Sequence, residues 1–182
     1  MSKILYHASV CKIPIQNIDT QYNKGNRLDF GTGFYLNTSR KNASKFINTA
    51  ILKHRRISNA PITKGYINIY KYTDVEKLKI KRFIEPNREW LLYVVNNRQY
   101  NRDMLLGYDI VIGPIADDST TLVLTNFIAG TYGNPESESA INIAIQMLET
   151  MNLATQVVLK TNKAIQCLSE HKYEEVRVAR RF

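Results

Sequence analysis

The stretch DFGTGFYLNTS, from Asp29 to Ser39, is the most conspicuous candidate for chemistry in this chain. Asp29-Phe30-Gly31 is the triplet with which protein kinases hold Mg²⁺ for phosphoryl transfer. A kinase also needs a glycine-rich loop, a lysine-bearing strand and a His-Arg-Asp loop ahead of that triplet. Only twenty-eight residues precede Asp29, and they contain none of these parts. The triplet must therefore serve another purpose.

Two other places carry polar side chains beside apolar, strand-like runs. His7 ends the run KILYH and is followed by the small residues Ala8 and Ser9, and Gln156 begins the run QVVLK. A neutral histidine at a strand end can donate a hydrogen bond to a hydroxyl group of a ligand. Taken singly, each of these residues is more often structural. Together, and in this order along the chain, they favour a binding site.

Carboxylates come next in the search for chemistry. Asp117 and Asp118 follow the run YDIVIGPI and could supply an acid to a site at that strand end. They could equally form a turn and cap the next helix. The sequence leaves both interpretations open.

Several classes of site are excluded or disfavoured. The chain contains neither G-x-G-x-x-G nor G-x-x-x-x-G-K-[ST], so we expect no Rossmann or P-loop nucleotide site. Cys11 and Cys167 stand alone without a Cys-x-x-Cys spacing, so we expect no zinc, no metal and no disulfide, but two reduced core thiols. No run reaches membrane-spanning length and the first residues do not form a signal peptide, which predicts a cytoplasmic protein without a membrane partner.

The apolar periodicity indicates elements that would position these residues. We expect a single domain over residues 1–182, of the α+β class, because strands and helices do not alternate regularly. The expected strands are KILYH, FYLNT, GYINIYKYT, YDIVIGPI and QVVLKT. The expected helices run from a cap at Thr38 or Ser39 to Arg56, from Pro86 through Val95, over 119–131, over 136–151, and from Thr161 through Leu168.

Charge is unevenly distributed along the chain. Residues 1–60 hold ten Lys and Arg side chains against two Asp and Glu, whereas the other residues hold fifteen against fourteen. The resulting basic region, Arg40 to Arg56, is centred on Arg40, Lys41, Lys45, Lys53, Arg55 and Arg56. Such a run is commonly a solvated helix face, but it could also dock an anion such as a dinucleotide, a nucleic acid or an acidic protein.

Four motifs carry a resemblance to a known superfamily. The stretches DFGTGFY, WLLYVVNNR, YDIVIGPIADD and TQVVLKT, with LYHAS ahead of them, resemble an uncharacterised bacterial family of the ADP-ribosyltransferase superfamily. The relevant branch is the His-Tyr-x type of diphtheria toxin and the poly(ADP-ribose) polymerases. The resemblance spans nearly the full chain. It implies an ADP-ribosyltransferase-like fold, in which two small packed β-sheets form an NAD cleft with flanking helices.

The resemblance also implies roles for individual residues. Catalysis would depend on His7, which holds a ribose, on Tyr35, which stacks on nicotinamide, and on Gln156 of the late strand. The remaining contacts to NAD, the co-substrate, would come from Tyr6, Ala8, Ser9, Asp29, Gly31, Gly33 and Phe34. Glycine and other small residues let the backbone approach the ligand closely, and a tyrosine ring offers a stacking face.

Gln156 departs from the pattern of the superfamily, whose late strand usually carries glutamate. Glutamine keeps a hydrogen bond to the ribose but lacks the negative charge, and a preorganised interaction of that kind is commonly worth about 3 kcal/mol. The implied function is therefore a mono-ADP-ribosyltransferase, slow or inactive, that modifies a protein or nucleic acid docked on the basic region. A bacterial or phage toxin with a small antitoxin-like partner is the expected context. The alternatives are an NAD glycohydrolase, an RNA-directed transferase, and a non-catalytic module that binds NAD or a partner.

Overall fold

The protein is an α+β structure, as the sequence predicts. The computed structural model describes residues 2–57, 64–116 and 118–177, without the side chains of residues 53, 55–57, 118 and 119. Its strands are β1 (Lys3–Ser9), β2 (Phe34–Asn37), β3 (Lys64–Tyr72), β4 (Ile80–Arg82), β5 (Ile110–Pro114), β6 (Thr155–Leu159) and β7 (Leu168–Arg177). Its helices are α1 (Arg40–Ile57), α2 (Arg88–Tyr100), α3 (Asp118–Ile128) and α4 (Glu138–Glu149), with 3₁₀ turns η1 (Ile15–Asn17) and η2 (Asn162–Cys167).

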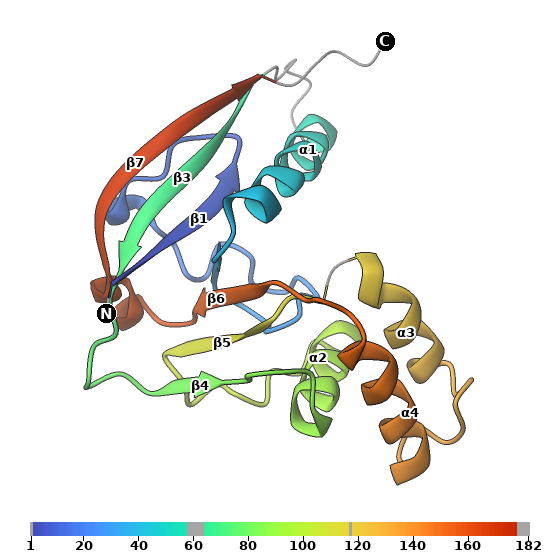
Figure 1. Cartoon of the computed structure of the whole chain (residues 1–182). Helices are drawn as coiled ribbons and strands as arrows, with labels where there is room; N and C mark the ends of the chain where they lie inside the picture. The colour runs from blue at the N-terminus through green and yellow to red at the C-terminus, as the bar shows by residue number, and fades with distance from the viewer. Residues whose placement is uncertain (1, 58–63, 117, 178–182) are drawn as a thin grey trace.

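The seven described strands form one sheet, where the resemblance implies two small packed sheets, and this sheet is weakly joined in the middle. The order is β4-β5-β6-β2-β1-β3-β7, and among the described strands β4 and β5 are the only neighbours that pair in parallel. β1 pairs with β3 along its whole length, but within the described residues it meets β2 at a single register pair, Tyr6 opposite Asn37. The sheet therefore consists of two parts, β1-β3-β7 and β2-β6-β5-β4, which diverge in Figure 1.

Each part of the sheet has its own helical cover (Figure 1). α1 packs Ile47 and Ile51 against Ile67 of β3. α2, α3 and α4 cover one face of the other part and build the largest apolar cluster, which includes Trp90, Phe127 and Val158. The opposite face is filled by a second cluster that includes Leu5, Phe34, Tyr70, Val157 and Cys167. None of the described helices is long and apolar enough to cross a membrane.

The predicted helix starts are close to those observed. The Ser39 hydroxyl accepts a hydrogen bond from the backbone N–H of Asn42, which is the geometry of an N-cap. α2 begins two residues after Pro86, because the Asn87 side chain caps it by accepting from the Trp90 N–H. Trp90, Leu91, Val94 and Val95 are buried, as the helical periodicity predicts.

Three sequence predictions are wrong: the last helix, the absence of a strand after it, and the burial of both cysteines. The helix expected from Thr161 through Leu168 is only the 3₁₀ turn η2, and the Thr161 hydroxyl bonds Asp109 instead of capping it. β7 follows this turn and was not predicted. Its sequence gives little signal, because most of its side chains are polar and only Leu168 of the strand is buried. Of the two cysteines, Cys167 is buried in the core but Cys11 is exposed.

Gly33 is required by packing at the start of β2. A Cβ atom added there would lie 2.4 Å from a methyl carbon of Val158 and 2.9 Å from the Leu159 carbonyl oxygen. The backbone oxygen cannot move aside without breaking the β2–β6 ladder. This close approach explains one of the two glycines in the Gly-x-Gly-Phe-Tyr stretch.

We predict that Gly33→Ala destabilises the protein by about 1–3 kcal/mol, the usual cost of forcing an extra carbon into a packed site. Gly107→Ala is the matched control, since nothing lies within 4 Å of a Cβ at that position. Thermal unfolding of the two variants measures the difference. Equal midpoints would show that β2 and β6 can move apart to accept a side chain.

Candidate functional site

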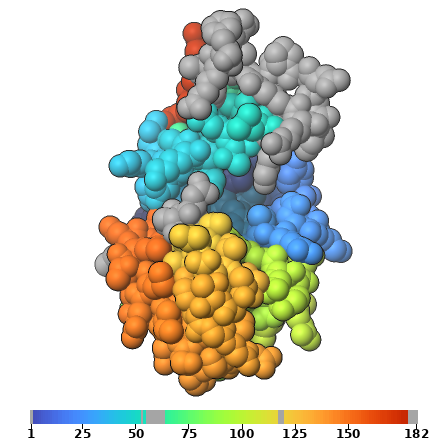
Figure 2. Space-filling model, turned by 90° about the vertical axis from the view of Figure 1, so that its right-hand side faces the viewer, coloured from blue at the N-terminus to red at the C-terminus, as the bar shows by residue number. Residues whose placement is uncertain are grey.

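The candidate site lies where the two parts of the sheet diverge. Beyond the Tyr6–Asn37 pair, β1 and β2 share no further register pair among the described residues. Figure 2 shows a recess in the surface between α1 and α3, bordered by the segment that precedes β2. The residues predicted to bind NAD come from β1, β2, β6 and the turn before β2, so these elements all meet around the junction.

His7 occupies the gap between β1 and β2. Its Nδ1 atom lies 2.7 Å from the backbone carbonyl oxygen of Tyr35, and its ring stacks on Phe34 with centroids 4.4 Å apart. The imidazole thus makes the contact to β2 that a backbone N–H of β1 would make in an unbroken ladder. A histidine at this position both links the two strands and holds them apart.

The protonation state of His7 follows from these contacts. A carbonyl oxygen only accepts, so Nδ1 must carry the hydrogen and donate it to Tyr35. Burial lowers the pKa of His7 below its ordinary value, and the hydrogen bond to Tyr35 only partly opposes this. At neutral pH the ring is therefore uncharged, and Nε2 is a hydrogen-bond acceptor. It would accept a ribose hydroxyl, whereas the simplest expectation from sequence is that His7 donates.

Tyr35 faces the other side of the sheet from Phe34 and His7, because adjacent strand residues point in opposite directions. Its hydroxyl donates to the Gly31 carbonyl oxygen at 2.7 Å and accepts from the Phe30 N–H at 3.0 Å. Burial and the nearby Asp29 carboxylate raise its pKa well above the ordinary value, so the phenol stays neutral. In this structure Tyr35 fixes the turn at residues 29–31, and the nicotinamide-stacking role remains a prediction.

Asp29 is the centre of a buried polar network. Its Oδ1 accepts from the Arg98 guanidinium at 2.8 Å, and its Oδ2 accepts from the Ala116 N–H at 3.0 Å and from the Gln156 amide at 3.2 Å. The Asn97 side chain donates to its backbone carbonyl oxygen. One carboxylate therefore ties together the turn before β2, the end of α2, the end of β5 and the start of β6.

A second buried ion pair clamps the next two residues of the turn. The Lys160 ammonium group bonds both the Asp103 carboxylate and the Phe30 carbonyl oxygen, and the Tyr93 hydroxyl donates to Asp103 at 2.7 Å. Lys160 is 6% exposed, and burial lowers its pKa although Asp103 opposes the shift. Gly31 has a φ of +69°, and a Cβ there would lie 2.6 Å from Asp103 Oδ2, so only glycine fits.

The predicted site residues thus fall into two neighbouring sets. Asp29, Gly31, Tyr35 and Gln156 are joined by hydrogen bonds, directly or through the turn, on the helix-covered face. His7 and Phe34 stack on each other on the opposite face, and His7 reaches the first set only through the Tyr35 backbone.

The remaining predicted contacts lie along β1. Tyr6 and Ala8 pack against the apolar cluster under α1. The Ser9 hydroxyl accepts from the Cys11 N–H at the end of β1. Asp117 lies outside the described residues, and so does the side chain of Asp118, the first residue of α3. No group of His, Cys, Asp and Glu in the described part of the chain is arranged to hold a metal ion.

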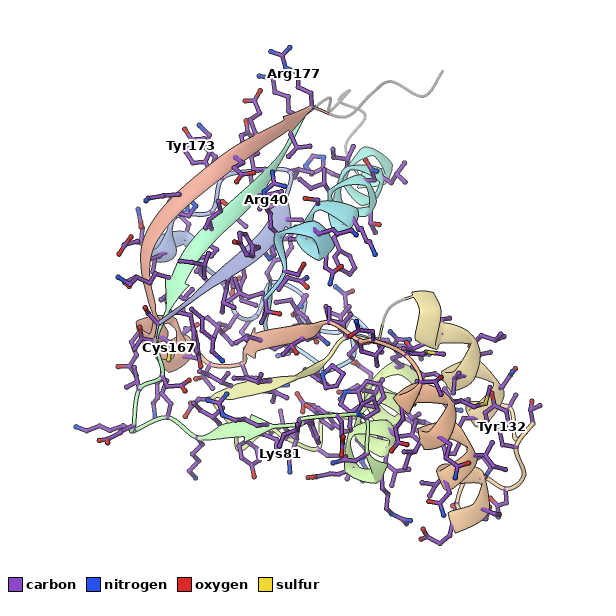
Figure 3. The ribbon with its side chains drawn as sticks, viewed as in Figure 1. Arg40, Lys81, Tyr132, Cys167, Tyr173 and Arg177 are labelled. Atoms are coloured by element: carbon purple, nitrogen blue, oxygen red, sulfur yellow. The ribbon has the colours of Figure 1, made fainter. Side chains whose placement is uncertain are left out.

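The basic region is partly neutralised by the strand that the sequence did not predict. Arg40, labelled in Figure 3, forms an ion pair with Glu174 of β7. Two more acids of β7 pair with lysines of β3, Lys64 with Glu175 and Lys71 with Glu170. Lys41 and Lys45 are exposed on α1, and the side chains of Lys53, Arg55 and Arg56 lie outside the described residues.

Sequence reasoning missed the residues that hold the turn. They are Tyr93, Asn97, Arg98, Asp103 and Lys160. Part of this set could have been predicted from the sequence of β6 and the residue after it. Gln156, Val158 and Lys160 lie two residues apart, so an extended strand places their side chains on one face. In α2, Tyr93 and Asn97 are four residues apart and lie on one helix face. Their link to Asp29 could not be read from spacing, because it depends on long-range packing.

We predict that Gln156→Glu destabilises the protein at pH 8, because it replaces the amide donor that faces Asp29 with a second carboxylate. The like charge and burial raise the folded-state pKa of the introduced carboxyl above its unfolded value near 4.3. The loss of unfolding free energy is therefore full above the raised pKa. It decreases as the pH falls from that raised pKa toward the unfolded value. Chemical unfolding from pH 8 to pH 4.5 tests this, with the exposed Gln166→Glu as control. An equal loss at every pH would contradict the carboxylate contact.

Lys160→Met tests the second ion pair. The methionine side chain keeps much of the buried volume but leaves Asp103 without its cation, and breaking a buried pair in this way costs about 3–5 kcal/mol. Lys163→Met is the control, since Lys163 is exposed three residues further along the chain. Urea unfolding should separate the two variants clearly. Identical unfolding curves would mean that the ion pair between Lys160 and Asp103 contributes nothing to stability.

Comparison with known proteins adds a family but no activity. The model of a family described as a protein of unknown function, DUF3990, matches residues 3–169, which includes every predicted site residue. No curated protein sequence matches the chain. On the extent of the family match, the chain belongs to the DUF3990 family.

Proposed function

We propose that this protein is an NAD-dependent mono-ADP-ribosyltransferase with an ADP-ribosyltransferase-like fold. The observation that carries the proposal is His7 in the gap between two diverging parts of the sheet, with Nδ1 held by Tyr35 and Nε2 left as an acceptor. A ribose hydroxyl is a suitable donor for that nitrogen. Figure 2 shows a recess between α1 and α3, on the side where the two parts of the sheet diverge.

The polar atoms of the junction suit a sugar ligand. The buried Oδ1 atom of Asn37 has no hydrogen-bond partner within the described structure, and Gln156 lies directly opposite it on β6. A buried acceptor without a donor is costly, since such groups usually have a partner in the protein or an ordered water. A donor on a ligand would relieve that cost. Two amide side chains on one face of the sheet, and a neutral histidine on the other, would bind hydroxyl groups without needing a charge on the ligand.

The reaction would be a substitution at the anomeric carbon of the nicotinamide ribose. A nucleophilic atom of the acceptor forms a bond to that carbon, and the bond to the nicotinamide nitrogen breaks. The bonding electrons leave with nicotinamide, and the acceptor loses a proton to solvent. Positive charge develops on the ribose. The carboxylate of Asp29, which accepts a hydrogen bond from Gln156, would stabilise that charge without touching the ligand.

Three alternatives accompany the proposal. A non-catalytic module that binds NAD or a partner is favoured by the Gln156–Asp29 hydrogen bond, since Gln156 carries no charge to the ligand. An RNA-directed transferase is favoured by the exposed lysines of α1, Lys41 and Lys45. An NAD glycohydrolase would transfer the same ADP-ribose group to water. Action as a cytoplasmic bacterial or phage toxin, controlled by a small antitoxin-like protein, is the expected context for the transferase.

We predict that His7→Phe weakens NAD binding at least tenfold. Phenylalanine can still stack on Phe34 but has no Nε2 acceptor, and losing one hydrogen bond to a ligand costs about a factor of ten. Lys163→Met should bind as the wild type does. Since burial lowers the pKa of His7, wild-type affinity should be constant from pH 8 to pH 7 and fall only at a pH below the ordinary histidine pKa of about 6.5, as the ring gains a proton. Calorimetry across this range provides the measurement, and unchanged affinity in His7→Phe would contradict the assignment.

Activity is tested with NAD labelled in the adenylate part and a total cell lysate. Label that survives nuclease digestion and is released by protease identifies a protein acceptor, and the reverse result identifies a nucleic acid. Free nicotinamide without transferred label would indicate a glycohydrolase. NAD binding without nicotinamide release would leave the non-catalytic module as the function, and the absence of both would end the NAD hypothesis.

A further inference from the structure

β7 presents a free edge of the sheet in the described structure. It is the last strand in the sheet order and pairs with β3 alone. Along an antiparallel edge strand, every second residue directs its backbone N–H and C=O groups away from the neighbouring strand. Figure 1 shows β7 as the outermost strand on the left border of the molecule. A further strand could therefore hydrogen-bond to β7 without displacing another described strand.

The charged side chains of β7 match a second copy of β7 that runs in the opposite direction. Lys172 and Glu174 flank Tyr173 and project from one face of the strand. If the two copies are related by a two-fold axis at Tyr173, Lys172 of each copy lies opposite Glu174 of the other. Opposite charges in directly opposed positions stabilise an antiparallel pair, and here the pairing occurs twice. On the other face, the same axis sets His171 opposite Glu175, so no like charges meet.

Other registers are less favourable. Directly opposed residues project from the same face, so a two-fold axis that keeps the sheet continuous must pass through a residue. Three other centres place a charged residue against itself: Lys172, Glu174 and Glu175. A centre at His171 moves the contact onto the irregular part of the β3–β7 ladder, where the register skips Glu170, which has a φ of +54°. Tyr173 is therefore the favoured centre.

Tyr173 is an exposed aromatic side chain whose position is already fixed. It is 49% exposed, and Figure 3 labels it on the border formed by β7. The Lys12 ammonium group donates to its hydroxyl at 2.9 Å and lies 4.0 Å from the centre of its ring. The ring also meets Tyr66 edge to face, with centroids 6.1 Å apart. Covering a side chain that is held in this way removes apolar surface from water at a small further cost in side-chain entropy.

We propose that the protein forms a two-fold symmetric dimer in which the β7 strands of two copies pair antiparallel, with Tyr173 at the axis. The partner is a second copy of this chain, because the charges of β7 are complementary to their own reverse. The two sheets would join into one continuous sheet, as when a peptide adds a strand to a sheet edge. β3 and β1 separate this edge from the junction with β2, so the inference goes beyond the proposed function and does not depend on it.

The first test reverses the charges one at a time and then together. Sedimentation equilibrium over a series of protein concentrations should show a reversible dimer for the wild type. Lys172→Glu and Glu174→Lys each oppose like charges twice, so each should weaken the dimer at least about tenfold. The double variant restores both opposite pairs and should recover most of the lost affinity. Lys163→Glu is the control, since it makes the same charge change at an exposed position outside β7.

The second test measures the register. In a Cys11→Ser background, Tyr173→Cys places one thiol from each copy beside the axis, where a short bis-maleimide reagent should link the two copies. Cys167 is buried and should not react. Glu175→Cys is the matched control, because its two thiols would be separated by four residues along the paired strands, about 13 Å. The same short reagent should not bridge that distance.

Each outcome decides for or against the pairing. A wild type that is monomeric at every concentration overturns the inference. A dimer that neither charge reversal weakens, or that cross-links through Glu175→Cys and not through Tyr173→Cys, uses another surface and also overturns it. Weakening in both single variants, recovery in the double variant and cross-linking through Tyr173→Cys support it. Circular dichroism checks that each variant is folded, and if a charge variant unfolds, the cross-linking result decides.

Discussion

The buried ionic clamp on the turn at residues 29–31 is the constraint on which the rest of this structure depends. Asp29 with Arg98, and Lys160 with Asp103, place two ion pairs under an apolar core. Charges in such a position are tolerated only when they are paired and hydrogen-bonded, and their main effect is to fix one arrangement. Here they fix the start of β2 against α2 and β6, which in turn sets the register that brings Asn37 opposite Gln156.

The second consequence of the clamp is the gap between the two parts of the sheet. With β2 bound to β6 on one side, β1 meets it at one residue pair only, and His7 fills the space beyond. A continuous ladder would satisfy its own backbone groups and leave no acceptor exposed to a ligand. The broken ladder leaves polar atoms at the junction, and this is why the candidate site lies there and not at a strand end on the sheet's rim.

The sequence was a good guide to local structure and a partial guide to the site. Apolar periodicity predicted α1, α2 and the buried strands, because burial of one face produces a repeat that can be counted. It failed for the short β4 and for β7, whose residues from Ser169 onward are mostly polar because they lie at an edge. The motif residues were found, but several serve a structural role that spacing does not reveal. Asp29, Tyr35 and Gln156 bond to one another and to the turn, since partners such as Arg98 and Lys160 come from distant parts of the chain.

The central claim is that the junction between β1 and β2 binds NAD through His7. A crystal structure of the protein with a non-cleavable carbocyclic NAD analogue tests it most directly. We expect the analogue in the recess between α1 and α3, with a ring hydroxyl within about 3 Å of His7 Nε2. Density for the analogue elsewhere on the molecule, with Nε2 of His7 bonded only to protein or water, would contradict the account.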